Sequence, residues 1–449
     1  MFSQGESIYR VMSVIDILNN NAKYYGDKVA VICNMESLTY RELLNHVVTE
    51  AQRLREEEKV APHTLYQFVA SQDITYLVRF LALHVIEAIC APVDAIMALP
   101  RYYDERVSDI LFTTGSTGFP KGVLLSWDAV LADAENLIEA HRYHDGLTFV
   151  ICGPIHHFGS WSKVMPTLLC GGTLYLLEGL KNSEALFMAL NSASRTATFL
   201  VPSAIRMLMQ QSGDRLSSLA SNIEFIETGA APIAACDMEH LRQLLPFTRL
   251  YNTYASTETG VVCTYPFHSL SAEPDYAGGL LDEHCMERCV GPTMRHACLR
   301  LVDGGHIAVR GRMIMTGYMH DPSATIEEVV TSDIGELDCK NRLYIIGRES
   351  DFINVGGLKV SPSEVEAAAM SIPWIKECIC IPHIHSLMGQ VPELLVVCEE
   401  SAYDRKAIIK YLKAHLDIYK VPLFYSMVPC IKKTFNGKID RKYYLLNSK

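Results

Sequence analysis

A glycine- and hydroxyl-rich stretch that ends in a lysine is the first part of this sequence that could perform chemistry. It reads TTGSTGFPKG over residues 113–122. Glycines let the backbone approach a bulky anion, hydroxyl and N–H groups donate hydrogen bonds to oxygens, and Lys121 supplies positive charge. Apolar residues lie directly before it (110–112) and after it (123–125), which indicates a loop anchored in a core. The stretch therefore predicts a phosphate-binding loop.

This loop differs from the P-loop of nucleoside triphosphatases, which reads GxxxxGK[ST] and requires its lysine to open a helix. Here Pro120 precedes the lysine and Gly122 follows it, while Gly118 lies three positions before the lysine instead of one. Proline disfavours helical backbone in the residue before it. The loop must therefore bind phosphates in another way.

A second polar cluster, NTYASTETG, covers residues 252–260. Taken alone, Ser256 or Thr257 followed by Glu258 is typical of a helix N-cap. An acidic protein that handles a polyphosphate needs Mg²⁺, however, and Mg²⁺ accepts a shell of one carboxylate, phosphate oxygens and water. Together with the first loop, Glu258 becomes a candidate magnesium ligand.

Two more polar clusters lie closer to the C-terminus. The segment from 331 to 366 offers Asp333 and Arg348, and KKTFNGKIDRK (432–442) carries Lys438 on a glycine-bearing turn. Each is a weak signal alone, because surface aspartates, turn arginines and solvated basic tails are common.

Residues 110–260 alternate short apolar runs with helical patterns, which predicts an α/β fold with largely parallel strands. We expect strands at 148–153, 173–179, 198–203 and 223–229, and helices at 127–141 and 204–211. Hairpin-forming strands follow at 299–318 and 335–347, then a hinge at 348–351 and a helix starting near Pro362. We therefore predict two domains, residues 1–347 and 348–449.

Composition limits the partners and the compartment. The 449 residues carry a formal net charge of −11 without a basic run, which argues against nucleic acid or an anionic membrane. The N-terminus lacks a basic region before an apolar run, and charged residues interrupt the most apolar segment, 76–93. We expect no membrane span. The fourteen cysteines include no CxxC pair, so their spacing does not favour zinc and indicates reduced thiols of a cytoplasmic protein.

Eight motifs in order resemble the AMP-forming adenylating superfamily, which includes acyl-CoA synthetases, aryl-CoA ligases, stand-alone adenylation domains and luciferases. The resemblance covers the chain from about Leu111 to the end. The motifs are TTGSTGFPKG (113–122), PIHHFGS (154–160), TGAAP (228–232), YASTE (254–258), GHIAVRG with TGYMHDP (305–322), TSDIG (331–335), GRESDFINVGG (347–357) and NGKID (436–440). It implies a large N-terminal domain of α/β layers with a β subdomain, and a small mobile α+β C-terminal domain.

The resemblance also implies a nucleotide site. The loop residues that would bind the β and γ phosphates of ATP are Thr113, Thr114, Gly115, Ser116, Thr117, Gly118 and Lys121. Adenine would lie between Tyr254 and the backbone of Gly229, Ala230 and Ala231, with Asn252 near its amino group. Thr257 would contact the α phosphate and Glu258 would bind Mg²⁺. Asp333 would accept hydrogen bonds from the ribose hydroxyls, and Arg348 would assist.

The implied reaction has two halves. A carboxylate attacks the α phosphorus of ATP, pyrophosphate leaves, and the resulting acyl-AMP passes its acyl group to a thiol. Lys438 would stabilise the charge of the first half, and the Gly356–Gly357 loop would replace it in the second. His157 would gate the mouth of the acid pocket.

The acid and the thiol acceptor are less well defined. Family members that load amino acids generally carry an aspartate in the segment matching 152–161, and ICGPIHHFGSW has none. We therefore expect an uncharged pocket for an aryl or medium acyl carboxylate, with CoA as acceptor. One alternative acceptor is the phosphopantetheine of an acyl carrier protein. A non-catalytic nucleotide-binding protein of the same fold is another alternative.

Three departures from the family pattern limit the resemblance. The chain before the phosphate loop is short, so residues 1–110 are expected to form a reduced sheet and helix layer. Ala255 replaces a usual glycine, which would tighten the floor of the acid pocket. Ser350 occupies the hinge position where Asp or Lys is usual, which affects the expected kinetics of the hinge and not its location.

Overall fold

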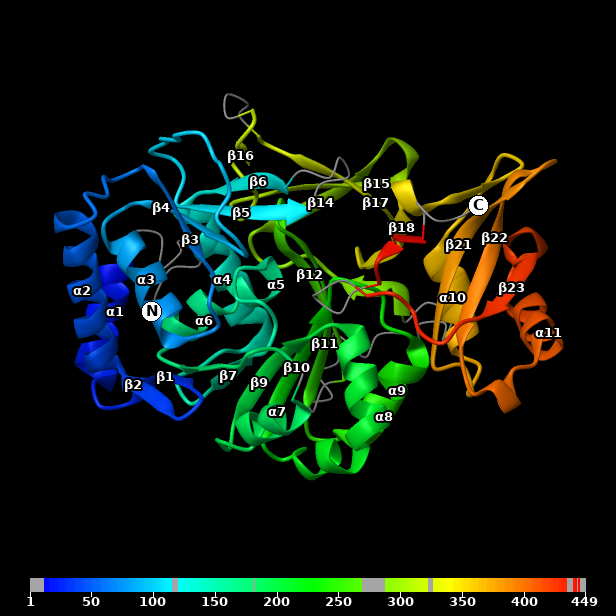
Figure 1. Ribbon diagram of the computed structural model, residues 1–449, viewed down its shortest axis with the longest axis horizontal. Coiled ribbons are helices and arrows are strands. Elements are labelled where there is room, and N and C mark those ends of the chain that lie inside the picture. The colour runs from blue at the N-terminus through cyan, green and yellow to red at the C-terminus, as the bar shows by residue number, and fades with distance from the viewer. Residues whose placement is uncertain are drawn as a thin grey trace.

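The protein is described by a computed structural model that covers residues 12–114, 120–180, 182–268, 287–321, 326–433, 439–441 and 443–444. Figure 1 shows two parts, a large body of three sheets with their helices and a smaller C-terminal unit to one side. The fold is mixed α/β, as the sequence predicts. Within these ranges no helix combines the length and apolarity needed to cross a bilayer.

An eight-stranded sheet forms the centre of the large body. Its order is β12 (Gly260–His268), β11 (Arg249–Ser256), β10 (Ile223–Gly229), β9 (Thr196–Leu200), β7 (Thr148–Ile151), β8 (Thr173–Leu176), β1 (Val29–Cys33) and β2 (Glu36–Thr39). The strands from β11 to β1 pair in parallel, and only the two edge pairs, β12–β11 and β1–β2, are antiparallel. The predicted parallel strands are confirmed.

Helices cover this sheet. They are α4 (Trp127–His141), α5 (Phe158–Trp161), α6 (Val164–Leu169), α7 (Ser183–Leu190), α8 (Pro202–Ser218) and α9 (Ala235–Leu244). α4 matches its prediction, with Ser126 as N-cap accepting from the Ala129 N–H. α8 is longer than the predicted 204–211 because Pro202 fits its first turn, and its backbone leaves the helical region at Ser212.

A second, five-stranded sheet positions the phosphate loop. Its order is β16 (Gly317–Tyr318), β6 (Pro120–Leu125), β5 (Asp109–Thr114), β4 (Ile89–Val93) and β3 (Leu65–Val69). β5 and β6 form an antiparallel pair from Asp109↔Leu125 to Thr114↔Pro120. The two strands on either side of the loop are therefore both parts of one sheet.

The N-terminal region differs from its prediction. It forms α1 (Val14–Tyr25), α2 (Tyr40–Glu56) and α3 (Ile74–Val85), of which α1 and α2 begin with capping boxes at Ser13 and Thr39. Its strands do not form a sheet of their own, since β1 and β2 extend the eight-stranded sheet while β3 and β4 extend the second one. The short N-terminal region is thus divided between two sheets.

A third sheet precedes the small domain. Its order is β13 (Cys289–Gly291), β18 (Leu343–Arg348), β17 (Val329–Leu337), β15 (His306–Gly311) and β14 (Ala297–Val302), with the 3₁₀ turn η2 (Asp303–Gly305) between β14 and β15. β14–β15 and β17–β18 are antiparallel neighbours, as the predicted hairpins require.

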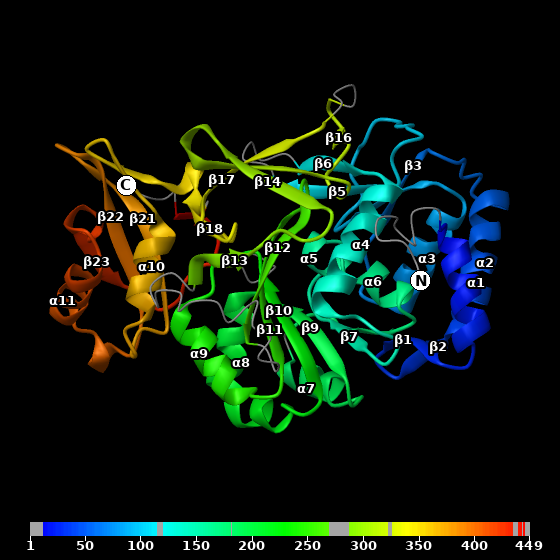
Figure 2. The same cartoon turned by 180° about the vertical axis from the view of Figure 1, so that it is seen from behind.

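The C-terminal unit has its own sheet and core. Its strands are β19 (Ile353–Val355), β20 (Leu358–Val360), β21 (Glu377–His385), β22 (Gly389–Val397) and β23 (Phe424–Met427). Its helices are α10 (Pro362–Met370) and α11 (Arg405–His415), with the 3₁₀ turns η3 (Glu349–Asp351), η4 (Glu400–Ala402) and η5 (Ile418–Lys420). Figure 2 shows α10 facing α9 of the large body, and the Cys236 thiol of α9 donates to the Met370 carbonyl at 3.5 Å. The Met370 sulfur also lies 3.6 Å from Nη1 of Arg206 in α8.

Candidate active site

The phosphate loop leaves a buried hairpin. Ile110 and Leu111 on β5 and Val123 and Leu124 on β6 are each at most 1% exposed, so the predicted anchoring in a core is confirmed. Thr113 and Lys121 are direct partners across the two strands. The remaining loop residues named in the prediction, Gly115, Ser116, Thr117 and Gly118, lie outside the described residues.

Tyr318 on β16 joins Lys121 to Glu258. The Lys121 ammonium lies 5.7 Å from the centre of the Tyr318 ring, and the Tyr318 hydroxyl donates to Glu258 Oε1 at 3.3 Å. Burial, followed by the neighbouring carboxylate, raises the pKa of Tyr318 to about 12, so its hydroxyl remains a donor at neutral pH. Our sequence analysis assigned Tyr318 no role, although it lies within the TGYMHDP motif.

Glu258 and Thr257 lie in the tight turn between β11 and β12. The Ser256 and Thr259 hydroxyls accept from each other's backbone N–H groups at 3.2 and 3.1 Å, and the Met315 N–H donates to the Glu258 carbonyl at 2.9 Å. The N-cap interpretation of this segment is therefore wrong, because a strand and not a helix follows it. The side chains of Thr257 and Glu258 are both half-buried.

The proposed adenine residues lie where β10 and β11 run in parallel. A Cβ at Gly229 would meet the Thr253 carbonyl oxygen at 2.5 Å, so only glycine allows this strand pairing. Ala230 has a left-handed backbone (φ 65°), which is strained for a residue with a side chain and is typical of ligand sites. Ala230 and Ala231 are exposed.

Asn252 is 3% exposed, and its Nδ2 donates to the Cys289 carbonyl at 2.9 Å. This contact orients the amide. Its carbonyl oxygen is then the atom that could accept a hydrogen bond from an adenine amino group.

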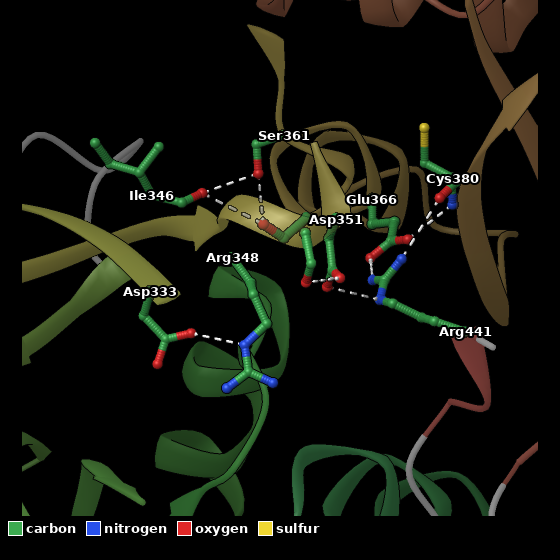
Figure 3. Close-up of polar contacts among 10 residues, drawn as sticks. Asp333, Ile346, Arg348, Asp351, Ser361, Glu366, Cys380 and Arg441 are labelled. Atoms are coloured by element: carbon green, nitrogen blue, oxygen red, sulfur yellow. Dashed lines mark hydrogen bonds and ion pairs between the residues drawn. The ribbon is translucent and has the colours of Figure 1, made fainter. Parts of the chain in front are cut away.

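Tyr254, Asp333 and Arg348 form a connected group. The Tyr254 hydroxyl donates to Asp333 Oδ2 at 2.9 Å. Arg348 Nε donates to Asp333 Oδ1 at 3.1 Å, as Figure 3 shows. Asp333 and Arg348 are opposite each other on β17 and β18. Burial, followed by Asp333, raises the pKa of Tyr254 well above its usual value, so the phenol stays neutral. The carboxylate is thus fixed in orientation beside the predicted adenine residues.

The turn that carries His157 is supported by two loops of the second sheet. Gln72, which follows β3, accepts from the Ile155 N–H at 3.0 Å and donates to the Gly153 carbonyl at 2.8 Å. Asp94, which follows β4, lies 2.9 Å from His156 Nε2. The His156 and His157 rings pack edge to face, with their centres 4.4 Å apart. Residues of the N-terminal region therefore hold the turn that carries His157.

A buried ion pair that the sequence analysis missed lies next to this segment. Lys163, 1% exposed, contacts Glu227 of β10 at 2.8 Å, and its ammonium lies 5.4 Å from the Phe199 ring. Phe199 also packs against Gly159, where a Cβ would meet the ring at 2.8 Å. The two charges neutralise each other. The signal available in the sequence was a lysine directly before the apolar segment Val164–Leu169.

Lys438 lies outside the described residues. On its C-terminal side, Arg441 is paired with Glu366 of α10 and lies 3.9 Å from Asp351 of η3 (Figure 3). Gly356 and Gly357, in the turn between β19 and β20, have positive φ angles of 57° and 96°. A Cβ at Gly356 would meet the Met388 side chain at 2.9 Å.

Comparison with known proteins agrees with this architecture. The family model described as "AMP-binding enzyme" matches residues 98–319, and that of the "AMP-binding enzyme C-terminal domain" matches residues 364–438. The chain belongs to this family of AMP-binding, adenylating enzymes, and the resemblance inferred from its motifs is confirmed.

Similar sequences include 2-succinylbenzoate–CoA ligases of Staphylococcus aureus. The one from strain JH9 is 28% identical over 347 residues, which cover 75% of this chain and 66% of the ligase. The match thus spans slightly less than two thirds of the relative's length.

Solved structures share the fold. ATP-bound MatB from Rhodopseudomonas palustris has a TM-score of 0.82 at 19% identity, covering 98% of this chain and 100% of MatB. o-Succinylbenzoate CoA synthetase (MenE) from Bacillus subtilis, in complex with its acyl-adenylate, has a TM-score of 0.79 at 18% identity and covers 95% and 97% of the two chains. The predicted adenylate-forming ligase fold is confirmed.

Proposed function

We propose that the protein activates an aryl or medium acyl carboxylate with ATP, forms acyl-AMP and pyrophosphate, and transfers the acyl group to CoA. The observation that carries this proposal is the connected group Tyr254–Asp333–Arg348 near the contact of Lys121, Tyr318 and Glu258. One group suits a ribose with its adenine, and the other suits a polyphosphate with a cation. Family membership and the CoA ligases among the relatives support the same reaction.

The nucleotide roles follow from donor and acceptor chemistry. A carboxylate fixed by Arg348 and Tyr254 can accept both ribose hydroxyls with its remaining lone pairs. Lys121 and the loop donors would offset the β and γ phosphate charges, and Thr257 would donate to the α phosphate. The backbone from Gly229 to Ala231 and the Tyr254 ring would enclose adenine.

Glu258 fits a magnesium site. It is a half-buried carboxylate in the turn between β11 and β12, and its Oε1 accepts from the Tyr318 hydroxyl. Mg²⁺ needs few protein ligands when phosphate oxygens and water complete its shell. When bound, it would neutralise charge on the pyrophosphate leaving group.

The two-domain division at residues 347 and 348 is part of the proposal. The small domain would close over the site and exclude water, which would otherwise hydrolyse the mixed anhydride. Lys438 would serve the first half-reaction, and the Gly356–Gly357 turn would serve the second.

Purified protein with Mg²⁺, ATP and the right acid is expected to form AMP and pyrophosphate. Pyrophosphate exchange into ATP should be screened over aryl acids, including 2-succinylbenzoate and anthranilate, and over medium-chain acids and dicarboxylates. ADP and phosphate as products would contradict an adenylating mechanism. Absence of exchange with every acid, alongside measurable ATP binding, would favour the non-catalytic alternative.

CoA is expected to be a better acceptor than dephospho-CoA by about one to two powers of ten. This range corresponds to the loss of one charge-assisted contact of about 1.5 to 3 kcal/mol with the 3′-phosphate. Lys359, two positions after Gly357, is a candidate for this contact: its side chain is 60% exposed and lies 3.7 Å from Glu349, which the phosphate would replace as its partner. Acyl transfer should be measured with CoA, dephospho-CoA and pantetheine. Equal rates with all three would favour a carrier protein as acceptor.

A further inference from the structure

Three potential metal ligands, with a tyrosine close to two of them, meet between helix α3 and the second sheet. Tyr76 and His84 come from α3, Cys90 from β4 and Asp109 from the first position of β5. Cys90 and Asp109 are register partners on adjacent parallel strands. We call these four residues the buried donor cluster. It is surrounded by aromatic groups, among them the rings of Phe80 and Trp127 at 4.8 and 5.0 Å from the His84 ring.

The cluster is buried and incompletely hydrogen-bonded. The His84 side chain is 4% exposed, Asp109 and Cys90 are 0% exposed, and Tyr76 is 3% exposed. Tyr76 Oη, His84 Nε2 and Asp109 Oδ1 are buried polar atoms without a hydrogen-bond partner. A buried polar group without a partner costs about 1–3 kcal/mol. Two of the three, His84 Nε2 and Asp109 Oδ1, face each other at 3.2 Å as an ion pair, and Tyr76 Oη has no hydrogen-bond partner, so the cluster has room for a shared ligand.

The His84–Asp109 distance suits two ligands of one tetrahedral ion. The ligand atoms of His84, Cys90 and Asp109 all lie within 4.8 Å of one another. His84 Nε2 and Asp109 Oδ1 are 3.2 Å apart without forming a hydrogen bond. Zinc bonds of about 2.0–2.2 Å in tetrahedral geometry place neighbouring N and O ligands about 3.3–3.5 Å apart. The observed separation is close to that of two ligands on one ion.

The charges also balance. A Cys90 thiolate and an Asp109 carboxylate with a neutral His84 sum to −2, which one divalent cation would neutralise in this apolar core. The Ser108 hydroxyl donates to Asp109 Oδ2 at 2.7 Å and leaves Oδ1 directed at the cluster. Hydrogen bonds of this kind orient ligating carboxylates in metal sites.

We propose that His84, Cys90 and Asp109 bind one structural Zn²⁺, with the Tyr76 oxygen or a water molecule as fourth ligand. The ion would connect α3, β4 and β5. Because β5 continues from Asp109 to Thr113 and Thr114, it would stabilise the strand that leads into the phosphate loop. The site is separate from Glu258. Sequence spacing gave no sign of it, since only one of its ligands is a cysteine.

The test is metal analysis of the full-length protein. After reconstitution with zinc and removal of loosely bound metal by gel filtration, elemental analysis is expected to give about one zinc per chain. The cobalt-substituted protein should show a sulfur-to-cobalt charge-transfer band and the intense visible absorption of tetrahedral cobalt. Zinc should raise the melting temperature, because it binds the folded state.

Cys90→Ser is expected to abolish the charge-transfer band and to weaken zinc binding by at least about 10- to 100-fold. Asp109→Asn, which keeps the side-chain volume, should weaken zinc binding to a similar extent. Cys378→Ser is the matched control, because that thiol is also buried but belongs to the small domain. It should keep both the zinc and the band.

Wild-type protein that takes up far less than one zinc, shows no charge-transfer band and melts at the same temperature with and without zinc would overturn the proposal. The cluster would then be a His84–Asp109 ion pair or would enclose a water molecule. This result does not depend on whether the Cys90 and Asp109 variants fold, and it is independent of the adenylation assay.

Discussion

Lys438→Ala is expected to slow acyl-adenylate formation by about 10²- to 10³-fold, the range typical for the loss of one donor that stabilises transition-state charge. Negative charge develops on the α phosphate and on the departing pyrophosphate, and Lys438 would offset it. Thioester formation from a synthetic acyl-adenylate should stay near the wild-type rate, because pyrophosphate has already left.

The neighbouring residues give a structural reason for this separation. Arg441, three positions after Lys438, is paired with Glu366 of the small domain, so the chain that follows the lysine is held to that domain. The Gly356–Gly357 turn belongs to the same domain. A rotation of the small domain would therefore exchange one segment for the other at a single acyl site.

The two half-reactions should be measured separately, by pyrophosphate exchange and by single-turnover thioester formation. Lys432→Ala is the matched control, since this exposed lysine lies in the same segment. It should leave both rates within about twofold, as expected for a surface substitution of at most about 0.5 kcal/mol. An equal loss in both halves for a folded Lys438→Ala protein would contradict the two-conformation mechanism.

The local parts of the fold could be predicted from the sequence. Trp127–His141 follows a helical repeat after a serine cap, and the apolar runs near 148, 173, 198 and 223 became parallel strands. These patterns depend on neighbours within one element. The turn at 256–259 was ambiguous, because a hydroxyl followed by a glutamate suits a helix cap and a hairpin turn equally well.

The parts that could not be predicted depend on long-range pairing. The 1–110 region was expected to form a reduced sheet and helix layer, but β1 pairs with β8 and β4 pairs with β5, so its strands enter two larger sheets. Tyr318 reaches Glu258 only because β16 pairs with β6. Lys163 and Glu227 are 64 positions apart. No periodicity in the sequence encodes these contacts.

The candidate site was predicted through motifs, and its geometry adds the partners of the named residues. Asp333 and Arg348 were assigned separately to the ribose, and they are a direct cross-strand pair. The contacts of Asn252 and Tyr254 define which of their atoms remain for a nucleotide. The assignments themselves stay predictions until variants are measured.

Glu258→Gln is expected to reduce adenylation turnover by about 10²-fold even at saturating ATP, on the scale of a lost electrostatic contribution to the transition state. Gln keeps the size of the side chain and an oxygen that can accept from the Tyr318 hydroxyl, so the substitution removes the charge and little else. A weaker ligand should also raise the Mg²⁺ concentration needed for half-maximal rate.

Tyr318→Phe separates the hydrogen bond from the charge. The contact it removes is long, at 3.3 Å, so we expect a loss of less than about tenfold, corresponding to at most about 1.4 kcal/mol, with an unchanged Mg²⁺ requirement. Initial rates of pyrophosphate exchange should be recorded for wild type and both variants over a Mg²⁺ titration at saturating ATP. If Glu258→Gln retained the wild-type Mg²⁺ dependence and turnover, Glu258 would not be a magnesium ligand. If Tyr318→Phe shifted the Mg²⁺ dependence as far as Glu258→Gln, the hydrogen bond would be needed to hold the carboxylate toward the ion, and the two residues would act as one unit.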